Sequence, residues 1–370
     1  MGVVLRLMVL LVAASCLLAG CASSRLNKSG DKLAGKQEPK PDKVLWPALP
    51  DQPRFRFAGI LRAASDFVQE SDNVQLMRKL TGQAASNDRP VISKPTGIAV
   101  RSGLVYVAEP AAKAVTVFDL ARRKLFRFGT REPNDLKRPQ AISVDREGLV
   151  YVLDSVLRKV MVFDGIGLFQ RAIDLSEGYT NPVSVAVSPD GTTLYVVDRG
   201  DLASNDHKLV AYGADGKEKF RLGPRGPEQG KFNIPLAATV ADDNTLYVAD
   251  TGNFRVQAFD GAGRFKFEFG KLGVEPGNFS RPRSIAVDPG GNIYVGDAGF
   301  SNVQIFNPKG DLLMPLGGLN RDPGPGNYAL LAGIAVDEGG RLYINDHYFK
   351  KIEVFLPLSE DEGRELVAGQ

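Results

Sequence analysis

Short apolar runs separated by turn residues repeat along most of the chain. In the best-formed copy, residues 281–288 (RPRSIAVD) lead through a Pro-Gly-Gly turn to residues 292–297 (NIYVGD) and then to residues 302–306 (NVQIF). Each run has the length of a short strand and is bounded by turn-forming residues. In the preceding copy, residues 265–269 (FKFEF) alternate strictly, so their apolar and charged side chains take opposite faces of a strand. The pattern predicts units of four short strands.

A tyrosine in the second run of each unit shows how many units there are. It occurs at Tyr106, Tyr151, Tyr195, Tyr247, Tyr294 and Tyr343, with spacings of 44 to 52 residues. An aromatic residue also ends each third run, at Phe118, Phe163, Tyr212, Phe259, Phe306 and Phe355. Repeats of this length with four antiparallel strands match the blades of a β-propeller. We therefore predict an all-β, six-bladed β-propeller with four-stranded antiparallel blades.

The sixth unit lacks a fourth strand of its own. Leu356 and Pro357 follow its third strand, and proline cannot donate to a strand ladder. Before the first unit, residues 55–59 (FRFAG) closely resemble residues 126–129 (FRFG), the expected fourth strand of blade one. We predict that this N-terminal strand completes the last blade and closes the ring, which removes the free sheet edges.

The N-terminus has the pattern of an export signal. No residue from Leu7 to Ser24 is charged, and Arg6 precedes this apolar run. A run of this length is also at the lower limit for an uncleaved transmembrane anchor. Residues 18–21 (LAGC) resemble the lipobox of bacterial lipoproteins, in which the cysteine sulfur carries a diacylglyceryl group. We predict a lipoprotein signal peptide over residues 1–20 and lipidation of Cys21.

The remaining boundaries follow from composition. Residues 21–52 are polar and rich in Lys, Pro, Gly and Ser, which predicts a disordered tether. The propeller is expected over residues 53–358 with a helical or loop insertion at residues 62–90, and residues 359–370 are expected to be a frayed tail. Ala22 stands where lipoproteins retained in the inner membrane often have Asp. We therefore expect a lipid-anchored protein of the cell envelope that faces the periplasm, in the outer membrane rather than the inner.

Composition removes several function classes. The two cysteines, Cys16 and Cys21, precede the folded body, which therefore contains no disulfide and no cysteine-based metal site. The net charge of +3 is small and charges of both signs are interspersed, so we expect no nucleic-acid partner. His207 and His347 fall in loops of opposite blades and are expected to be exposed and too far apart to share an ion. We predict no metal and no cofactor.

Residues 281–288 with residues 294–297, and residues 250–259 (DTGNFRVQAF), resemble NHL repeats. The resemblance covers roughly residues 94–355, although blade one has Glu109 for the usual Asp and blade three has a longer loop. It implies a six-bladed propeller used mainly to bind proteins, RNA or other ligands, with a few enzymes among its relatives.

Two sets of charged residues recur at fixed places in the units. An acidic residue follows the second strand each time, at Glu109, Asp154, Asp198, Asp250, Asp297 and Asp346. Because it repeats, we expect it to accept backbone N–H bonds within its own turn rather than to hold a cation. Basic residues beside the prolines that begin the blades form a candidate ligand face, at Lys94, Arg138, Arg281 and Arg283. Arginine pairs bidentately with carboxylates and phosphates, so this face suits an acidic ligand. Arg199 is assigned no role.

These observations predict a monomeric binding or scaffold propeller without catalysis. Its partners would be a membrane, through the lipid, and a periplasmic or envelope protein. One alternative is a lyase-like or lactonase-like enzyme acting on a small ligand, which would need a bound metal. Another is binding of envelope polysaccharide, which would need exposed aromatic side chains on the loops; the available residues are Tyr179, Phe232, Phe279, Phe300, Tyr328 and Tyr348.

Overall fold

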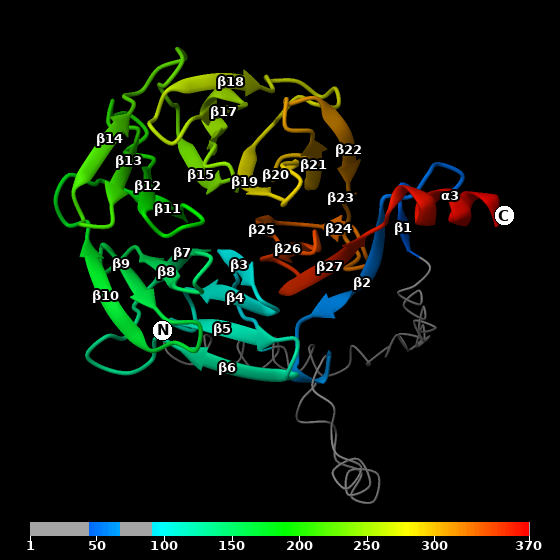
Figure 1. Cartoon of the computed structure of the whole chain (residues 1–370), viewed down its shortest axis with the longest axis horizontal. Helices are drawn as coiled ribbons and strands as arrows, with labels where there is room; N and C mark the ends of the chain where they lie inside the picture. Colours follow the sequence, from blue (N-terminus) through cyan, green and yellow to red (C-terminus); the bar gives the residue numbers. More distant parts are fainter. Residues whose placement is uncertain (1–43, 67–90, 370) are drawn as a thin grey trace, which may run out of the picture. The chain divides into compact units, whose positions relative to one another are not determined.

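The computed structural model describes residues 44–66 and 91–369, in which six sheets of four or five strands are arranged in a ring (Figure 1). The predicted fold class, a six-bladed β-propeller, is confirmed. The predicted signal peptide, Cys21 and most of the tether and of the insertion lie outside the described residues. Of that insertion, the 3-10 turn η2 (Ala64–Asp66) is described.

In the described part of the chain, no helix is long and apolar enough to cross a membrane.

Each blade is a meander of antiparallel strands. Blade one holds β3 (Ile98–Arg101), β4 (Leu104–Glu109), β5 (Ala114–Asp119) and β6 (Lys124–Phe128); blade two holds β7 (Pro139–Val144), β8 (Val150–Asp154), β9 (Lys159–Phe163) and β10 (Phe169–Asp174). Blade three holds β11 (Pro182–Val187), β12 (Thr193–Asp198), β13 (Lys208–Gly213) and β14 (Glu218–Leu222); blade four holds β15 (Pro235–Val240), β16 (Leu246–Asp250), β17 (Arg255–Phe259) and β18 (Phe265–Phe269), with the 3-10 turn η4 (Thr251–Asn253). Blade five holds β19 (Pro282–Val287), β20 (Ile293–Asp297), β21 (Asn302–Phe306) and β22 (Leu312–Leu316); blade six holds β25 (Leu331–Val336), β26 (Leu342–Asp346), β27 (Lys351–Pro357), β2 (Phe55–Leu61) and β1 (Leu45–Trp46). A short parallel pair, β23 (Gly318–Leu319) and β24 (Asn327–Tyr328), lies between blades five and six.

The burial of each strand explains its sequence pattern. The second and third strands of a blade have neighbours on both faces and are nearly continuous runs of Val, Leu, Ile and Tyr; all five residues of β16 are buried. The fourth strand has one exposed face, so β18 alternates between half-buried phenylalanines and exposed Lys266 and Glu268. Four of the inner strands begin with proline, a position where its missing N–H is tolerated.

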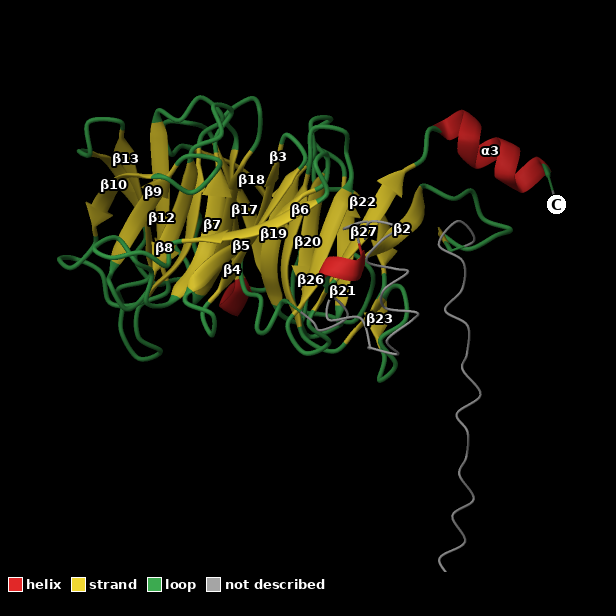
Figure 2. Cartoon of the chain, turned by 90° about the horizontal axis from the view of Figure 1, so that it is seen from below, coloured by secondary structure: helices red, strands yellow, loops and turns green. Residues whose placement is uncertain are grey.

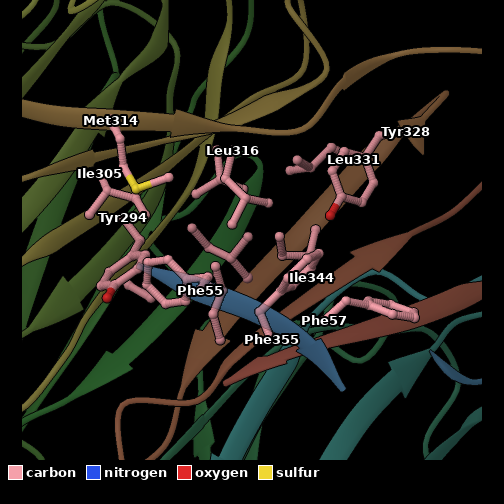
Figure 3. Close-up of a cluster of buried hydrophobic side chains, with 14 residues drawn as sticks. Phe55, Phe57, Tyr294, Ile305, Met314, Leu316, Tyr328, Leu331, Ile344 and Phe355 are labelled. Atoms are coloured by element: carbon pink, nitrogen blue, oxygen red, sulfur yellow. The ribbon is translucent and has the colours of Figure 1, made fainter. Parts of the chain in front are cut away.

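The N-terminal strand closes the ring as predicted. β2 pairs with β27 in blade six, with Phe57 opposite Phe355. Figure 3 shows the shared core, in which the Phe55 ring also lies edge-on to Tyr294 of blade five at 6.4 Å. The predicted tether boundary at residue 52 is wrong, because β1 adds a fifth strand to this blade and the Trp46 ring packs against Phe355 at 5.6 Å.

The predicted frayed tail is also wrong. Residues Glu360–Ala368 form helix α3, which extends from the rim of the ring (Figure 2). Ser359 and Glu362 make a capping box: Glu362 N donates to Ser359 Oγ at 3.2 Å, and Ser359 N donates to a Glu362 carboxylate oxygen at 2.8 Å. The acidic residues in the first turn further favour the helix through its dipole.

Candidate ligand-binding site

The strands run across the ring so that their connections gather on two opposite faces (Figure 2). We call one the loop face: it carries the connections from each fourth strand to the next first strand and those between second and third strands. The other, the turn face, carries the connections between first and second strands and between third and fourth strands. Because the blades are antiparallel meanders, every inner strand begins at the loop face and ends at the turn face.

The six inner strands line a central channel. A cavity of about 270 Å³ opens at its loop-face mouth, and a second cavity of about 200 Å³ lies toward the turn face. Both are lined by one ring of side chains at mid-channel: Ile98, Ile142, Val185, Ala238, Ile285 and Ile334. The channel therefore has an apolar throat between two differently built mouths.

The recurring acids fix the loops around this mouth. Asp154 is fully buried; one carboxylate oxygen accepts from the backbone N–H groups of Val156 and Leu157 in its own turn. Its other oxygen accepts at 2.7 Å from the N–H groups of Lys137 and Arg138, which precede the first strand. Only the first pair was expected from sequence. Asp154 thus joins two loop-face segments.

The other blades repeat this arrangement with small changes. Asp198, Asp297 and Asp346 accept from the corresponding segments, Asp250 accepts from Asn233 N, and Glu109 accepts from Ser93 N. Burial raises the pKa of the Asp250 carboxyl, although the Arg255 guanidinium at 2.9 Å opposes the effect. Through these hydrogen bonds, the six recurring acids hold the loops that precede the first strands.

A β-bulge follows the first residue of five inner strands and sets what faces the channel. In blade five, Pro282 pairs with Asp297 and Ser284 pairs with Gly296, so Arg283 has no partner in the ladder. The bulged residues are Gln140, Val183, Leu236, Arg283 and Ala332, and Thr96 takes this place in blade one; all six line the loop-face cavity. Arg283 is the charged member of that ring.

Two further arginines line the same cavity as Arg283. Arg281 precedes Pro282 in blade five, and Arg199 follows the buried acid of blade three. With its amide oxygen toward Arg199, Asn181 accepts from Nε at 2.8 Å and from one terminal nitrogen at 2.9 Å. Burial and the positive charges of Arg281 and Arg199 lower the pKa of the Arg283 guanidinium. Among the residues that the structure describes, no carboxylate lies within ion-pair distance of these three arginines.

The turn-face mouth is built in the opposite way, because its arginines are paired. Arg146 of blade two binds Asp242 of blade four at 2.8 Å. Arg101 of blade one binds Glu338 of blade six at 3.1 Å. The two mouths therefore differ in one respect: the arginines that line the turn-face cavity are paired with carboxylates, and those that line the loop-face cavity are not.

The sequence of two blades matches a known repeat. Residues 232–259 and 279–306 match the NHL repeat family. The chain is a six-bladed β-propeller, and blades four and five match the NHL repeat. Several solved propellers resemble it: a protein from Bacteroides thetaiotaomicron (TM-score 0.60, 16% identity, 83% of this chain and 77% of that one) and virginiamycin B lyase from Staphylococcus aureus (0.52, 13%, 72% and 96%). A gluconolactonase from Xanthomonas campestris is similar (0.53, 16%, 72% and 87%). At these identities the likeness is one of fold.

The propeller separates the predicted ligand-face residues into two groups. Arg281, which is exposed, and Arg283, which is half-buried, line the loop-face cavity. Lys94 and Arg138 are exposed on the same face and do not line it. Sequence reasoning missed Arg199. The sequence marks Arg199 only as a basic residue directly after the repeated acid Asp198. That Arg199 shares a cavity with Arg281 and Arg283 follows from the ring, which brings blades three and five to the same mouth.

The expected exposure of the histidines is wrong for His207, which is fully buried. Its Nδ1 accepts from Ile234 N at 3.0 Å and its Nε2 lies 3.1 Å from the Asp201 carbonyl, so it joins the long loop of blade three to blade four. His347 is half-buried, with Nδ1 at 3.0 Å from the Pro95 carbonyl. In the described ranges, no three His, Cys, Asp or Glu side chains are grouped to hold a metal.

Most of the aromatic residues that the polysaccharide alternative would need on the surface are buried. Phe232, Phe279 and Tyr328 are fully buried, and Tyr179 is buried with its hydroxyl 2.7 Å from that of Tyr212. They fill the spaces under the loops. Of the six aromatics, Tyr348 is the one that is largely exposed, at 68%.

Proposed function

We propose that this propeller is a binding module that holds an acidic protein partner on its loop face. The observation that carries the proposal is that most of the exposed large hydrophobic side chains lie on the same face as the cationic mouth. Seven of the eleven exposed large hydrophobic side chains in the described residues belong to loop-face connections: Val156, Leu202, Leu272, Val274, Leu319, Leu330 and Tyr348.

Physical chemistry favours an interface at such a surface. Apolar side chains gathered on one face cost solvation free energy that a partner recovers by covering them. Apolar and arginine side chains together are the usual composition of binding hot spots. The buried acids hold the loops in place, which lowers the entropy cost of association. The arginines that line the mouth of the channel select a partner of negative charge.

The test compares two single substitutions of similar exposure on opposite faces. Val274→Glu, 84% exposed in the connection between β18 and β19, should weaken capture of the partner from envelope extract at least tenfold. Ile166→Glu, 72% exposed between β9 and β10 on the turn face, should leave capture unchanged. Capture is quantified by mass spectrometry after crosslinking, with thermal melts to show that both variants fold. Equal capture by the two variants would contradict the proposal.

We also propose that a lipid on Cys21 displays the propeller to the periplasm from the outer membrane. Residues 18–21 (LAGC) support it, and two or three acyl chains at ~0.8 kcal/mol per buried methylene anchor a protein stably. Cys21→Ser should abolish incorporation of labelled palmitate and leave the precursor uncleaved, whereas Cys16→Ser should behave as the wild type. Density fractionation of envelopes reports the membrane. Unchanged labelling of the Cys21→Ser protein would disprove the anchor.

Two of the solved propellers that this chain resembles are named as enzymes, a virginiamycin B lyase and a gluconolactonase. A shared propeller fold does not transfer those activities to this chain.

A further inference from the structure

We propose that the loop-face mouth of the channel is a built site for one oxyanion, a carboxylate or phosphate group, held by Arg199, Arg281 and Arg283. The inference rests on the proposed use of the loop face as the binding face and adds the chemical class of the group that it takes. It names a small acid, or the acidic end of a longer ligand, because the cavity of about 270 Å³ admits a group of that size.

The first support is the place of Arg283 in the repeat. Five of the six blades put an uncharged side chain at this position of the inner strand, among them Val183, Leu236 and Ala332. The fold therefore has no need of a charge there. A bulge turns a side chain out of the ladder, and here it places the guanidinium in the mouth of the channel.

The second support is the cost of leaving these charges unpaired. Arg283 is partly buried; this burial, and after it the positive charges of Arg281 and Arg199, lower the pKa of its guanidinium. Like charges gathered in a partly desolvated site destabilise the folded chain unless a counter-charge is present. At the other mouth the same channel supplies carboxylates for its arginines, Asp242 and Glu338. The loop-face mouth keeps its positive charge available for an anion.

The third support is the set of free donors. Asn181 binds two nitrogens of Arg199 and so fixes the direction of its third. The guanidinium groups of Arg281 and Arg283 make no ion pair with the described residues, and their forked N–H groups match the oxygens of a carboxylate or phosphate.

The apolar throat defines the rest of the ligand. Ile98, Ile285 and Ile334 stand directly below the mouth and offer no hydrogen-bonding side chain. An anion bound by the arginines would direct its uncharged part either into this throat or out toward the loop face. A ligand with charge at one end fits both geometries, whereas a second charged group in the throat would lose its solvation without a partner.

The experiment titrates the full chain with inorganic phosphate and, separately, with succinate at constant ionic strength. Calorimetry should show one saturable site for at least one probe, which should also raise the melting temperature. Arg283→Met should weaken that binding at least tenfold. Because other blades carry uncharged residues here, the variant should fold, with a melting temperature without ligand equal to or above that of the wild type. Arg199→Met is the second variant and should also lose affinity.

Arg138→Met is the matched control, because it removes one positive charge from the position in blade two that corresponds to Arg281. Its affinity should stay within twofold of the wild type. Binding of phosphate alone identifies a phosphate site, and binding of succinate alone identifies a carboxylate site; either supports the proposal. No saturable binding of either probe, or an equal loss in Arg138→Met and Arg283→Met, would overturn it.

The titrations test the anion site separately from the proposed protein partner, because phosphate and succinate bind without that partner present. If Val274→Glu and the wild type capture the same proteins while phosphate still binds, the proposed partner surface fails and the anion site stands. If capture depends on Val274 and neither anion binds, the anion site fails alone.

Discussion

At the scale of single residues, blade six contains a buried ion pair that holds a loop in place. Lys351, 1% exposed, donates through Nζ at 3.0 Å to the carbonyls of Pro323 and Gly324 and binds Glu353. Glu353 is fully buried and accepts from the Tyr328 hydroxyl at 2.8 Å. Burial raises the pKa of the Glu353 carboxyl, while Lys351 opposes the change. The pair fixes the connection that enters β25.

Replacing Lys351 with Met should destabilise the propeller by about 3–5 kcal/mol, because Glu353 is left buried without its counter-charge. The folded state already binds a proton at Glu353 more tightly than the unfolded state, so this group's contribution to stability falls as pH rises above the ordinary glutamate pKa. Without Lys351, burial raises the pKa of Glu353 further, so the loss of stability with rising pH grows. The decrease in the free energy of unfolding caused by Lys351→Met, measured by urea denaturation, should therefore be larger at pH 8 than at pH 5.

The control for this prediction is Lys217→Met, which removes an amine whose side chain is 84% exposed. Its free energy of unfolding should stay within about 0.5 kcal/mol of the wild type at both pH values. An equal loss at pH 5 and pH 8 in the Lys351→Met protein would show that packing, and not the charge of Glu353, sets the cost.

At the scale of strands, the elements could be predicted and the bulges could not. The tyrosine of each second strand and the alternation of each fourth strand have strong physical causes, burial on two faces or on one. The bulge at Arg283 has no recognisable sequence pattern, because Pro-Arg-Ser is equally compatible with a regular strand. Sequence reasoning could place a basic residue near the mouth of the channel. It could not show that the side chain enters the channel.

The same limit explains the other differences. Arg199 and Arg281 are 82 positions apart, and only closure of the ring puts them at one cavity. His207 is buried because the long loop of blade three folds back over it, a contact that composition does not reveal. The helix after Ser359 was predictable, since Ser359 and Glu362 have the spacing of a capping box. Acidic composition alone had favoured a frayed tail.

At the scale of the molecule, the ring is held closed by one strand from the N-terminus. β2 lies between β1 and β27, and its Phe57 ring, 5% exposed, packs at 5.6 Å against Phe355. Trp46 of β1, the single tryptophan, contacts the same Phe355 ring. Each other blade is a continuous stretch of chain, so separation of β2 from β27 is the one route by which blade six opens without breaking a hairpin.

Phe57→Ala should therefore loosen the pairing of β2 with β27 before the rest of the ring opens. We expect a loss of about 3–5 kcal/mol, with hydrogen exchange in β27 rising before exchange in the other blades and with a red shift of Trp46 fluorescence. Phe128→Ala is the matched control, because Phe128 is also 5% exposed and ends the corresponding Phe-Arg-Phe strand of blade one, inside a continuous blade. It should destabilise the protein to a similar extent and leave β27 protected. If both substitutions raise exchange in the same strands, blade six has no special role in opening, and the ring unfolds as a single cooperative unit.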